Sequence, residues 1–368
     1  MWRWPPTCNR FDGAWPKAYH ALCMGSQRST IARRGVFSAK VLENNQLCLD
    51  HYQLVLQLEA FPPCRAGQFV TVRCGQVEPI QAPREIQWQA GQLPELYGPE
   101  LTGRQPLLRR PFSLAGRRDV GGKVELEIIH HVIGVGTAFL AEARRGDEIE
   151  LLGPLGNGFD ILPTGRAVVV GGGVGIPPML YLAQQLTEAG KQVVAFAGAR
   201  TRAVLPLTIG SAQPPSTAGW PGMCTAEFAA RATPTVVATD DGSLGVAGFV
   251  SQALEQWLDR EQPATDDLAV YACGPAPMMR AIATIALGRG YRCQVALERH
   301  MGCGLGTCQS CVVKVKSGDP ADGGARPSVS AHPTGNAAQL TGNSVQPAWQ
   351  YKLACKDGPV FDAADLVW

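Results

Sequence analysis

Three cysteines near the C-terminal end constrain this chain more than any other feature. Cys303, Cys308 and Cys311 follow the spacing C-x4-C-x2-C, and three glycines lie among and beside them in GCGLGTCQSC. This spacing, completed by a remote fourth cysteine such as Cys355, is typical of plant-type [2Fe–2S] sites. Glycines suit such a loop because the backbone must turn tightly and bring its N–H groups close to the cluster sulfurs. A structural zinc site would instead show paired C-x2-C knuckles, and this loop has only one.

The length and composition are those of a soluble protein with two or three domains. The chain has 368 residues, of which 45% are hydrophobic and 17% charged, which is enough for several cores. Its formal net charge is +2, and no stripe of Lys or Arg suggests nucleic acid as a partner. We expect no membrane-spanning segment, because the most apolar stretch, 167–183, is interrupted by glycine and proline.

The cysteine content also bears on the cellular compartment. Twelve cysteines in a chain of this length, three of them in one loop, do not resemble a secreted disulfide framework. Reduced thiols in the cytoplasm are the simpler expectation. Residues 1–35 carry Trp, Pro and Cys without periodicity and without a secretory pattern, and we predict a disordered extension there.

Residues 36–160 are predicted to form a β-barrel domain of Greek-key type. Short runs of alternating apolar residues recur at Tyr52–Leu58, Gln68–Arg73 and Val124–His130, with turn-forming residues between them. The segment 75–105 is rich in Pro, Gly and Gln and lacks apolar periodicity, so we predict a long surface loop.

Two short motifs in this domain suggest a flavin site. Arg110–Ser113 reads RPFS, and Gly134–Thr137 reads GVGT before a helix-like run. Glycine amides and a threonine hydroxyl at a helix start suit a pyrophosphate, and an arginine beside them would suit a flavin dinucleotide. A basic turn that enters a strand explains Arg110–Ser113 equally well, so the residues alone leave both interpretations open.

Residues 161–292 are predicted to form a Rossmann-like parallel α/β domain. The buried-strand run AVVV at 167–170 leads into a glycine turn and a helix with proline in its first turn. Further strands are predicted at Gln192–Ala197, Thr235–Thr239 and Leu268–Cys273. The candidate residues for a nicotinamide cofactor are Gly171, Gly172, Gly173, Gly175, Cys273, Gly274 and Pro275.

The choice between NAD and NADP is left open by the residues that follow the predicted strands. Arg200 and Arg202 lie where a 2′-phosphate would bind, but a solvated loop explains them equally well. Asp240 and Asp241 would contact a ribose or hold the turn before Gly242, and we favour the turn.

Residues 293–368 form the third predicted domain, which contains the cysteine loop. Segment 317–347 is low in complexity and almost free of large apolar residues, and we predict disorder there.

The three predicted domains together imply one function, which is electron transfer. A hydride delivers two electrons and a [2Fe–2S] cluster takes one at a time, and a flavin connects the two modes. No Ser/His/Asp set, HExxH motif or paired carboxylates indicate another chemistry.

The ordered run of motifs resembles one family closely. The motifs are RPFS, GVGT, GPLGNGF (153–159), GGGVGIPP (171–178), ATDDGSLGVAGFV (238–250), ACGPAPMM (272–279) and CGLGTCQSC with ACKDGPVF (354–361). Together they resemble the electron-transfer subunit of NAD-dependent (class 1B) dihydroorotate dehydrogenase, a branch of the ferredoxin–NADP reductase-like superfamily. The resemblance covers roughly residues 37–361.

The resemblance implies specific roles for residues. For FAD it implies contacts from Arg110, Pro111, Phe112, Ser113, Ile129, His130, His131, Gly136 and Thr137. For the cluster it implies Cys303, Cys308, Cys311 and Cys355. The family often has Tyr-Arg in place of His130-His131. The 43 residues between Cys311 and Cys355 exceed the usual spacing. A longer loop closes at little entropic cost, about 0.6 kcal/mol per doubling, and Cys273 and Cys293 are alternative fourth ligands.

The resemblance also implies a partner. In the family this subunit pairs with an FMN-containing catalytic subunit that oxidises dihydroorotate to orotate in pyrimidine synthesis, as a heterotetramer of two copies of each. This chain would pass the electrons to NAD⁺. Alternatives are a flavin and iron–sulfur subunit that serves a ferredoxin, hydrogenase or sulfite reductase complex, and a zinc-stabilised binding module without a redox role.

Overall fold

The computed structural model of the protein describes residues 34–75, 108–210, 225–317 and 349–368. The predicted extension at 1–35, the predicted loop at 75–105 and the low-complexity segment at 317–347 lie almost entirely outside these ranges. Within the four described ranges, no helix is long and apolar enough to cross a membrane.

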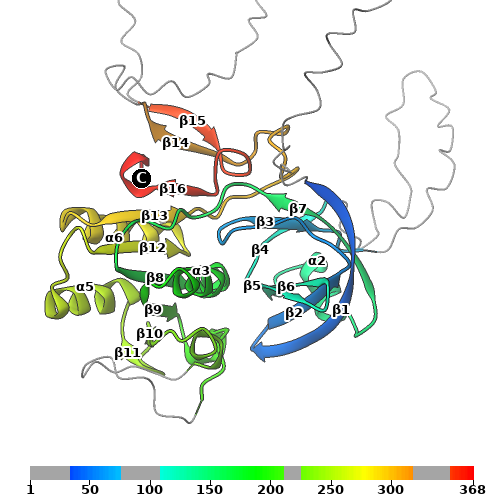
Figure 1. Ribbon diagram of the computed structural model, residues 1–368, viewed down its shortest axis with the longest axis horizontal. Helices are drawn as coiled ribbons and strands as arrows, with labels where there is room; N and C mark the ends of the chain where they lie inside the picture. Colours follow the sequence, from blue (N-terminus) through cyan, green and yellow to red (C-terminus); the bar gives the residue numbers. More distant parts are fainter. Residues whose placement is uncertain (1–33, 76–107, 211–224, 318–348) are drawn as a thin grey trace, which may run out of the picture. The chain divides into compact units, whose positions relative to one another are not determined.

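The first domain is an antiparallel sheet of seven strands that curls into a half-barrel (Figure 1). In spatial order the sheet runs β4-β3-β7-β1-β2-β6-β5. The strands are β1 (Gly35–Cys48), β2 (His51–Leu58), β3 (Phe69–Val72), β4 (Arg110–Ser113), β5 (Gly116–Val120), β6 (Lys123–His131) and β7 (Glu148–Leu155). Alternate residues of β6 (Val124, Leu126 and Ile128) are buried, as the period-two pattern predicted. The short helix α2 (Val135–Ala141) follows β6.

The second domain confirms the predicted parallel sheet and extends it. Its order is β11-β10-β9-β8-β12-β13-β16, and only β16 runs antiparallel to its neighbour. The strands are β8 (Arg166–Gly172), β9 (Gln192–Ala199), β10 (Thr235–Thr239), β11 (Val246–Ala247), β12 (Leu268–Cys273), β13 (Arg292–Ala296) and β16 (Val360–Asp362). The chain runs outward from β8 to β11 and then returns to β12. The strand order therefore reverses between β8 and β12, where open α/β sheets bind their ligands.

Helices cover both faces of this sheet. Figure 1 shows α3 (Ile176–Glu188) on the side of the half-barrel, and α5 (Val250–Glu261) and α6 (Ala276–Gly288) on the other side. The burial of β8 follows this division: Val169 packs in the core shared by α3 and the half-barrel, while Val168 and Val170 pack with α5 and α6. The remaining short helices are η2 (Gly173–Gly175), η3 (Arg202–Val204), α4 (Ala226–Ala229) and η4 (Ala363–Asp365).

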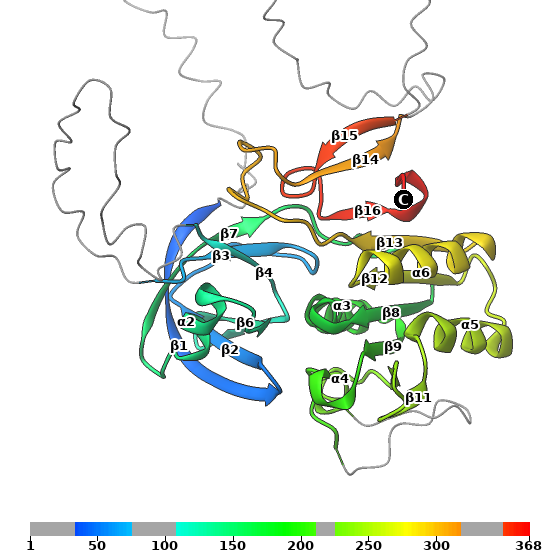
Figure 2. The ribbon, with the colours of Figure 1, turned by 180° about the vertical axis from the view of Figure 1, so that it is seen from behind.

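The cysteine loop leads into a small antiparallel pair, β14 (Val312–Lys316) and β15 (Trp349–Leu353), which lies beyond β13 and β16 (Figure 2). This pair has no separate core. Cys311 and Cys355 are buried in the same hydrophobic cluster as Phe69 of β3 and Leu155 of β7. The cysteine loop is therefore packed on the end of the half-barrel. The predicted domain boundary near residue 293 falls inside β13, so the second sheet continues past it.

Candidate functional site

The four motif cysteines come together as two pairs. The amide of Cys308 donates to Sγ of Cys303 at 3.4 Å, and the amide of Cys355 donates to Sγ of Cys311 at 3.4 Å. Burial first, and then the hydrogen bond with Cys311 and the charges of Cys311 and Cys303, raise the pKa of the Cys355 thiol to about 12. A Cβ atom on Gly306, which lies between Cys303 and Cys308, would be 3.4 Å from Cδ of Lys356, the residue after Cys355, so the two pairs are neighbours.

The pairing of the cysteines two by two matches the ligand arrangement of a binuclear cluster. The four cysteines of a [2Fe–2S] cluster are divided between two irons. Hydrogen bonds with Ser310, and further ones with Cys303, lower the pKa of the Cys308 thiol to about 6. Cys308 is therefore readily available as a thiolate, the form that binds metal.

The alternative fourth ligands lie in the second sheet. Cys293 is fully buried inside β13, and Cys273 ends β12. Cys355 is the cysteine that contacts Cys311. The β14–β15 ladder is responsible, because it pairs Val312 with Leu353 and so brings the residues that flank each cysteine together.

Glycine at 304 allows the cysteine loop to approach the half-barrel. Gly304 has a φ of +71°, and a Cβ atom there would lie 2.9 Å from Cγ2 of Thr71 in β3. An L-residue with a side chain would meet both a strained backbone and a steric clash. β3 pairs directly with β4, where Phe69 is opposite Ser113. The cysteine loop and the RPFS motif are thus separated by a single strand.

The predicted flavin motifs lie side by side in the half-barrel. Arg110–Ser113 forms the edge strand β4. A Cβ on Gly136 would lie 3.3 Å from Cγ of Arg110, so the start of α2 approaches the arginine closely. Thr137 accepts hydrogen bonds from the amides of Ile133 (2.9 Å) and Gly134 (3.2 Å). Its hydroxyl therefore holds the turn that presents the α2 amides.

A cluster of histidines borders the two predicted flavin motifs. His130 of β6 is 2% exposed and packs at right angles to Phe112, with 5.9 Å between ring centroids. Neither of its ring nitrogens has a partner in the described residues, and burial lowers its pKa to about 4. His51 and His131 stack in parallel beside it at 4.3 Å. A buried, neutral imidazole without a partner beside Arg110–Ser113 is consistent with a polar group of a bound cofactor completing its hydrogen bonds.

The predicted nicotinamide residues meet where the strand order reverses. A Cβ on Gly175 would lie 2.2 Å from the carbonyl oxygen of Cys273, so only glycine allows the β8–α3 turn to contact the end of β12. Burial, followed by the charge of Glu298, raises the pKa of the Cys273 thiol to about 12, which keeps it neutral. Gly274 and Pro275 follow, and Pro275 is the N-cap of α6. These residues form one continuous edge beside the predicted phosphate turn.

A cleft of about 800 Å³ opens beside the ends of β9 and β10. It is lined on one side by Arg202, Asp241 and Ser243. Asp241 accepts hydrogen bonds from the amide (3.0 Å) and hydroxyl (2.6 Å) of Ser243, which is the turn role that the sequence favoured. Leu47–Leu49, from the β1–β2 hairpin of the half-barrel, also line it, and the amide of Leu49 donates to the carbonyl of Ala203 at 3.0 Å. No sequence motif indicated that this hairpin contributes.

Comparisons with known proteins agree with this geometry. Residues 298–324 match the sequence model described as the iron–sulfur cluster binding domain of dihydroorotate dehydrogenase B, and residues 169–284 match that of an oxidoreductase NAD-binding domain. A solved structure described as an NADH-dependent reduced ferredoxin–NADP oxidoreductase shares the fold. Its TM-score is 0.62 at 24% identity, over 90% of each chain.

Two curated relatives from different organisms carry the same name. The protein named "Dihydroorotate dehydrogenase B (NAD(+)), electron transfer subunit" from Geobacillus thermodenitrificans is 37% identical over 265 residues, 71% of this chain and 81% of the relative. Its counterpart from Desulforamulus reducens is 30% identical over 335 residues, 90% of this chain and 98% of the relative. Both alignments span more than one of the domains described above. The chain therefore belongs to the family of electron transfer subunits of dihydroorotate dehydrogenase B.

Proposed function

We propose that this chain carries electrons from a dihydroorotate-oxidising catalytic subunit to NAD⁺. One observation carries the proposal: the buried cluster that contains Cys311 and Cys355 also contains Phe69 and Leu155 of the flavin half-barrel. A one-electron site and a candidate flavin site are thus held in one packed unit. When bound, FAD supplies the exchange between single electrons and a hydride pair that NAD⁺ and a [2Fe–2S] cluster need.

Each cofactor has a proposed set of holding residues. The cluster would be held by Cys303, Cys308, Cys311 and Cys355. FAD would be held by Arg110, Pro111, Phe112, Ser113, Ile129, His130, His131, Gly136 and Thr137. NAD would be held by Gly171, Gly172, Gly173, Gly175, Cys273, Gly274 and Pro275. In this assignment Arg110 and the α2 amides supply positive charge for phosphates, and the packed Gly175–Cys273 contact orients the nicotinamide end.

The cleft beside β9 and β10 supports NAD over NADP. It lies where the adenosine half of a dinucleotide binds in such sheets. Hydrogen bonds with the Ser243 hydroxyl and amide lower the pKa of Asp241, so this carboxylate stays ionised at the cleft. An ionised carboxylate accepts a hydrogen bond from a ribose hydroxyl, and its negative charge repels a 2′-phosphate. Arg202 lines the same cleft and would oppose this preference, which makes Asp241→Asn the informative variant for comparing NADH with NADPH.

The proposed partner is the FMN-containing catalytic subunit, in a cytoplasmic heterotetramer of two copies of each. Together the two subunits would oxidise dihydroorotate to orotate for pyrimidine synthesis. Co-expression followed by copurification tests this assembly. A complex that reduces NAD⁺ with dihydroorotate supports the proposal, whereas a hydrogenase, a sulfite reductase or a ferredoxin as the copurifying partner would replace it.

The first measurement is the visible spectrum of anaerobically purified protein, with iron, sulfide and flavin assays. About two irons and one flavin per chain, bleached by NADH, are the expected result. Flavin without iron would reduce the proposal to a plain flavin reductase. A colourless protein that contains zinc would favour the binding-module alternative.

A further inference from the structure

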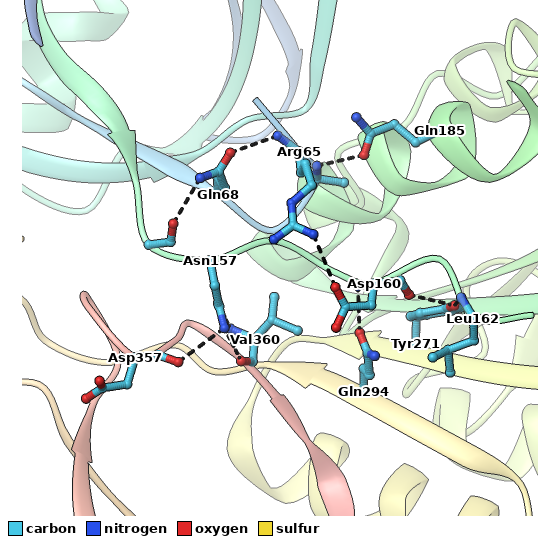
Figure 3. A network of polar contacts seen from close by, with 12 residues as sticks. Arg65, Gln68, Asn157, Asp160, Leu162, Gln185, Tyr271, Gln294, Asp357 and Val360 are labelled. Atoms are coloured by element: carbon cyan, nitrogen blue, oxygen red, sulfur yellow. Dashed lines mark hydrogen bonds and ion pairs between the residues drawn. The ribbon is translucent and has the colours of Figure 1, made fainter. Parts of the chain in front are cut away.

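The segment after β7 connects all three parts of the described chain (Figure 3). On the half-barrel side, Nε2 of Gln68 donates to the carbonyl of Gly156 at 2.9 Å. On the side of the second sheet, the hydroxyl of Tyr271 donates to the carbonyl of Asp160 at 3.1 Å. Between these two points lies Asn157, whose side chain faces the turn that carries Cys355.

Asn157 uses the full hydrogen-bonding capacity of its amide group on that turn. Nδ2 donates to the carbonyls of Asp357 (3.1 Å) and Val360 (2.8 Å), and Oδ1 accepts from the amide of Val360 at 2.9 Å. The backbone amide of Asn157 also donates to the carbonyl of Gly358 at 2.6 Å. A side-chain amide offers two donors and a carbonyl acceptor, and all of these groups reach one short stretch of chain.

The turn held in this way contains the fourth candidate cluster ligand. The amides of Asp357 and Gly358 both donate to the carbonyl of Leu353, at 2.7 and 3.3 Å. Oδ2 of Asp357 accepts from the amide of Leu353 at 2.8 Å. These bonds close a loop around Cys355. A displacement of Asp357 would therefore be transmitted to Cys355.

The other end of the contact is fixed to the strands next to the flavin motif. Asn157 is the second residue after β7, and Leu155 at the end of β7 pairs with Phe69 of β3. Phe69 pairs in turn with Ser113 of the RPFS strand. Hydrogen bonds therefore run from the flavin strand through β3, β7 and Asn157 to the turn that contains Cys355.

We propose that Asn157 is a positioning residue that sets the distance between the cluster and the flavin. This inference rests on the proposed function, since it needs both cofactors. Asn157 is not one of the residues proposed to hold the cluster or the flavin. It acts by holding the Cys355 turn against the end of the half-barrel. Loss of its side-chain bonds would loosen that turn and slow electron passage between the centres, while leaving hydride exchange at the nicotinamide side intact.

A second polar bridge in the same segment provides a matched control. Nη1 of Arg65 pairs with Oδ1 of Asp160 at 3.1 Å, with the two side chains 55% and 71% exposed. This pair also joins two parts of the chain, but it does not reach the Cys355 turn. Exposed ion pairs of this kind contribute little to stability. Asp160→Ala should therefore behave like the wild type in every assay below.

The test compares Asn157→Ala, Asn157→Asp and Asp160→Ala in the full-length holoprotein. Rapid mixing with NADH measures the rate of cluster reduction, and an artificial acceptor that takes electrons from flavin reports hydride transfer alone. Asn157→Ala should slow cluster reduction on the order of tenfold, as small misplacements of reacting groups do. Asn157→Asp keeps the acceptor for Val360 and loses both donors, and it should be slowed similarly. Flavin reduction should stay at the wild-type rate in all three.

Hydrogen exchange supplies a readout that does not depend on turnover. Amides in the Leu353–Val360 stretch should exchange faster in Asn157→Ala than in Asp160→Ala. If Asn157→Ala fails to fold, Asn157→Asp carries the same test, because it keeps the acceptor for the Val360 amide and loses only the two donors. Slow cluster reduction with fast amide exchange in Asn157→Asp supports the proposal, and wild-type values of both overturn it.

Two results separate the failure of this inference from the failure of the proposed function. Cluster reduction and amide exchange at wild-type levels in Asn157→Ala would overturn the positioning role while the electron chain stands. Wild-type protein that binds no iron or no flavin would overturn the proposed function, and the positioning role with it.

Discussion

The backbone amide of Cys355 lies 3.4 Å from the sulfur of Cys311, although 43 residues separate the two cysteines in the sequence. The contact is produced by the β14–β15 ladder, which pairs Lys316 with Trp349 at one end and Val312 with Leu353 at the other. One further backbone bond, from the amide of Ala354 to the carbonyl of Cys311 at 2.9 Å, extends the pairing to the cysteines. The ladder, and not the length of the connection, determines where Cys355 lies.

Cys355→Ser should abolish the cluster, while Cys293→Ser should leave it intact. Serine preserves the size of the side chain but lacks the soft thiolate that iron–sulfur clusters require. Cys293 is an equally buried cysteine on the neighbouring strand β13 and is the matched control. Iron and sulfide assays, with an electron paramagnetic resonance spectrum of the reduced protein, measure the outcome. Full iron content in Cys355→Ser would show that another residue is the fourth ligand.

Replacing residues 317–348 with an Asn-Gly turn should leave iron content and NADH oxidation unchanged. Lys316 and Trp349 are directly paired, so a two-residue hairpin turn spans the gap. Shortening the connection also lowers the entropic cost of closing the loop, by about 0.6 kcal/mol for each halving of its length. Tyr351→Pro is the contrasting variant, because proline removes a backbone donor from β15, and it should lose iron. Loss of iron in the Asn-Gly chain would mean that the removed segment itself positions Cys355.

Gly304→Ala should reduce cluster occupancy, whereas Gly122→Ala should not. Both glycines have positive φ, +71° and +80°, so both substitutions strain the backbone by about 1 kcal/mol. They differ in their surroundings. A Cβ on Gly304 would be 2.9 Å from Thr71, but a Cβ on Gly122 meets nothing within 4 Å. The ratio of iron to protein, measured after identical purification, distinguishes the effect of the clash with Thr71 from the effect of backbone strain. Equal iron content in the two variants would show that the approach to β3 is unimportant.

Acidification should destabilise the flavin half-barrel through His130. Its pKa is lowered to about 4 in the folded protein, chiefly by burial, from 6.5 in the unfolded chain. The folded state therefore favours the neutral ring, so the stabilisation is complete above pH 6.5 and is lost as the pH falls toward 4. Between about pH 7.5 and pH 5 this amounts to about 2 kcal/mol. His51, whose pKa is also lowered by burial, contributes with the same sign.

The check is urea unfolding of wild-type protein and His130→Phe at both pH values, each without added flavin. Phenylalanine fills a similar volume and leaves no unpaired nitrogen. The stability of the variant should therefore fall less with pH than that of the wild type, by about 2 kcal/mol. Identical pH dependence of the two proteins would contradict the assignment.

Much of the chemistry was predictable from short motifs. The spacing of Cys303, Cys308 and Cys311 predicted a cluster loop, and this stretch matches the iron–sulfur domain model. In the structure Cys308 contacts Cys303, and Cys355 contacts Cys311. The strand Thr235–Thr239 was predicted with the bounds that β10 has. These features were predictable because a ligand spacing and a buried apolar strand each depend on residues that are close together in the sequence.

Other features needed the tertiary structure. The longest strand, β1 (Gly35–Cys48), has a mixed polar and apolar sequence and was not predicted. Its place in the sheet comes from pairing with β2 and β7, which lies more than a hundred positions further along the chain. The wall that Leu47–Leu49 contributes to the cleft was missed for the same reason.

The sequence by itself determined the types of chemical group and their local spacing: four thiols, an RPFS motif and a glycine turn before a helix. Tertiary structure decided which of these groups meet. It placed Gly304 against Thr71, Gly175 against Cys273, and Asn157 against the turn that holds Cys355. The physical reason is that ligand type and backbone conformation depend on neighbouring residues. Contacts between distant segments depend on strand pairing and on the burial of a shared core, which no local pattern records.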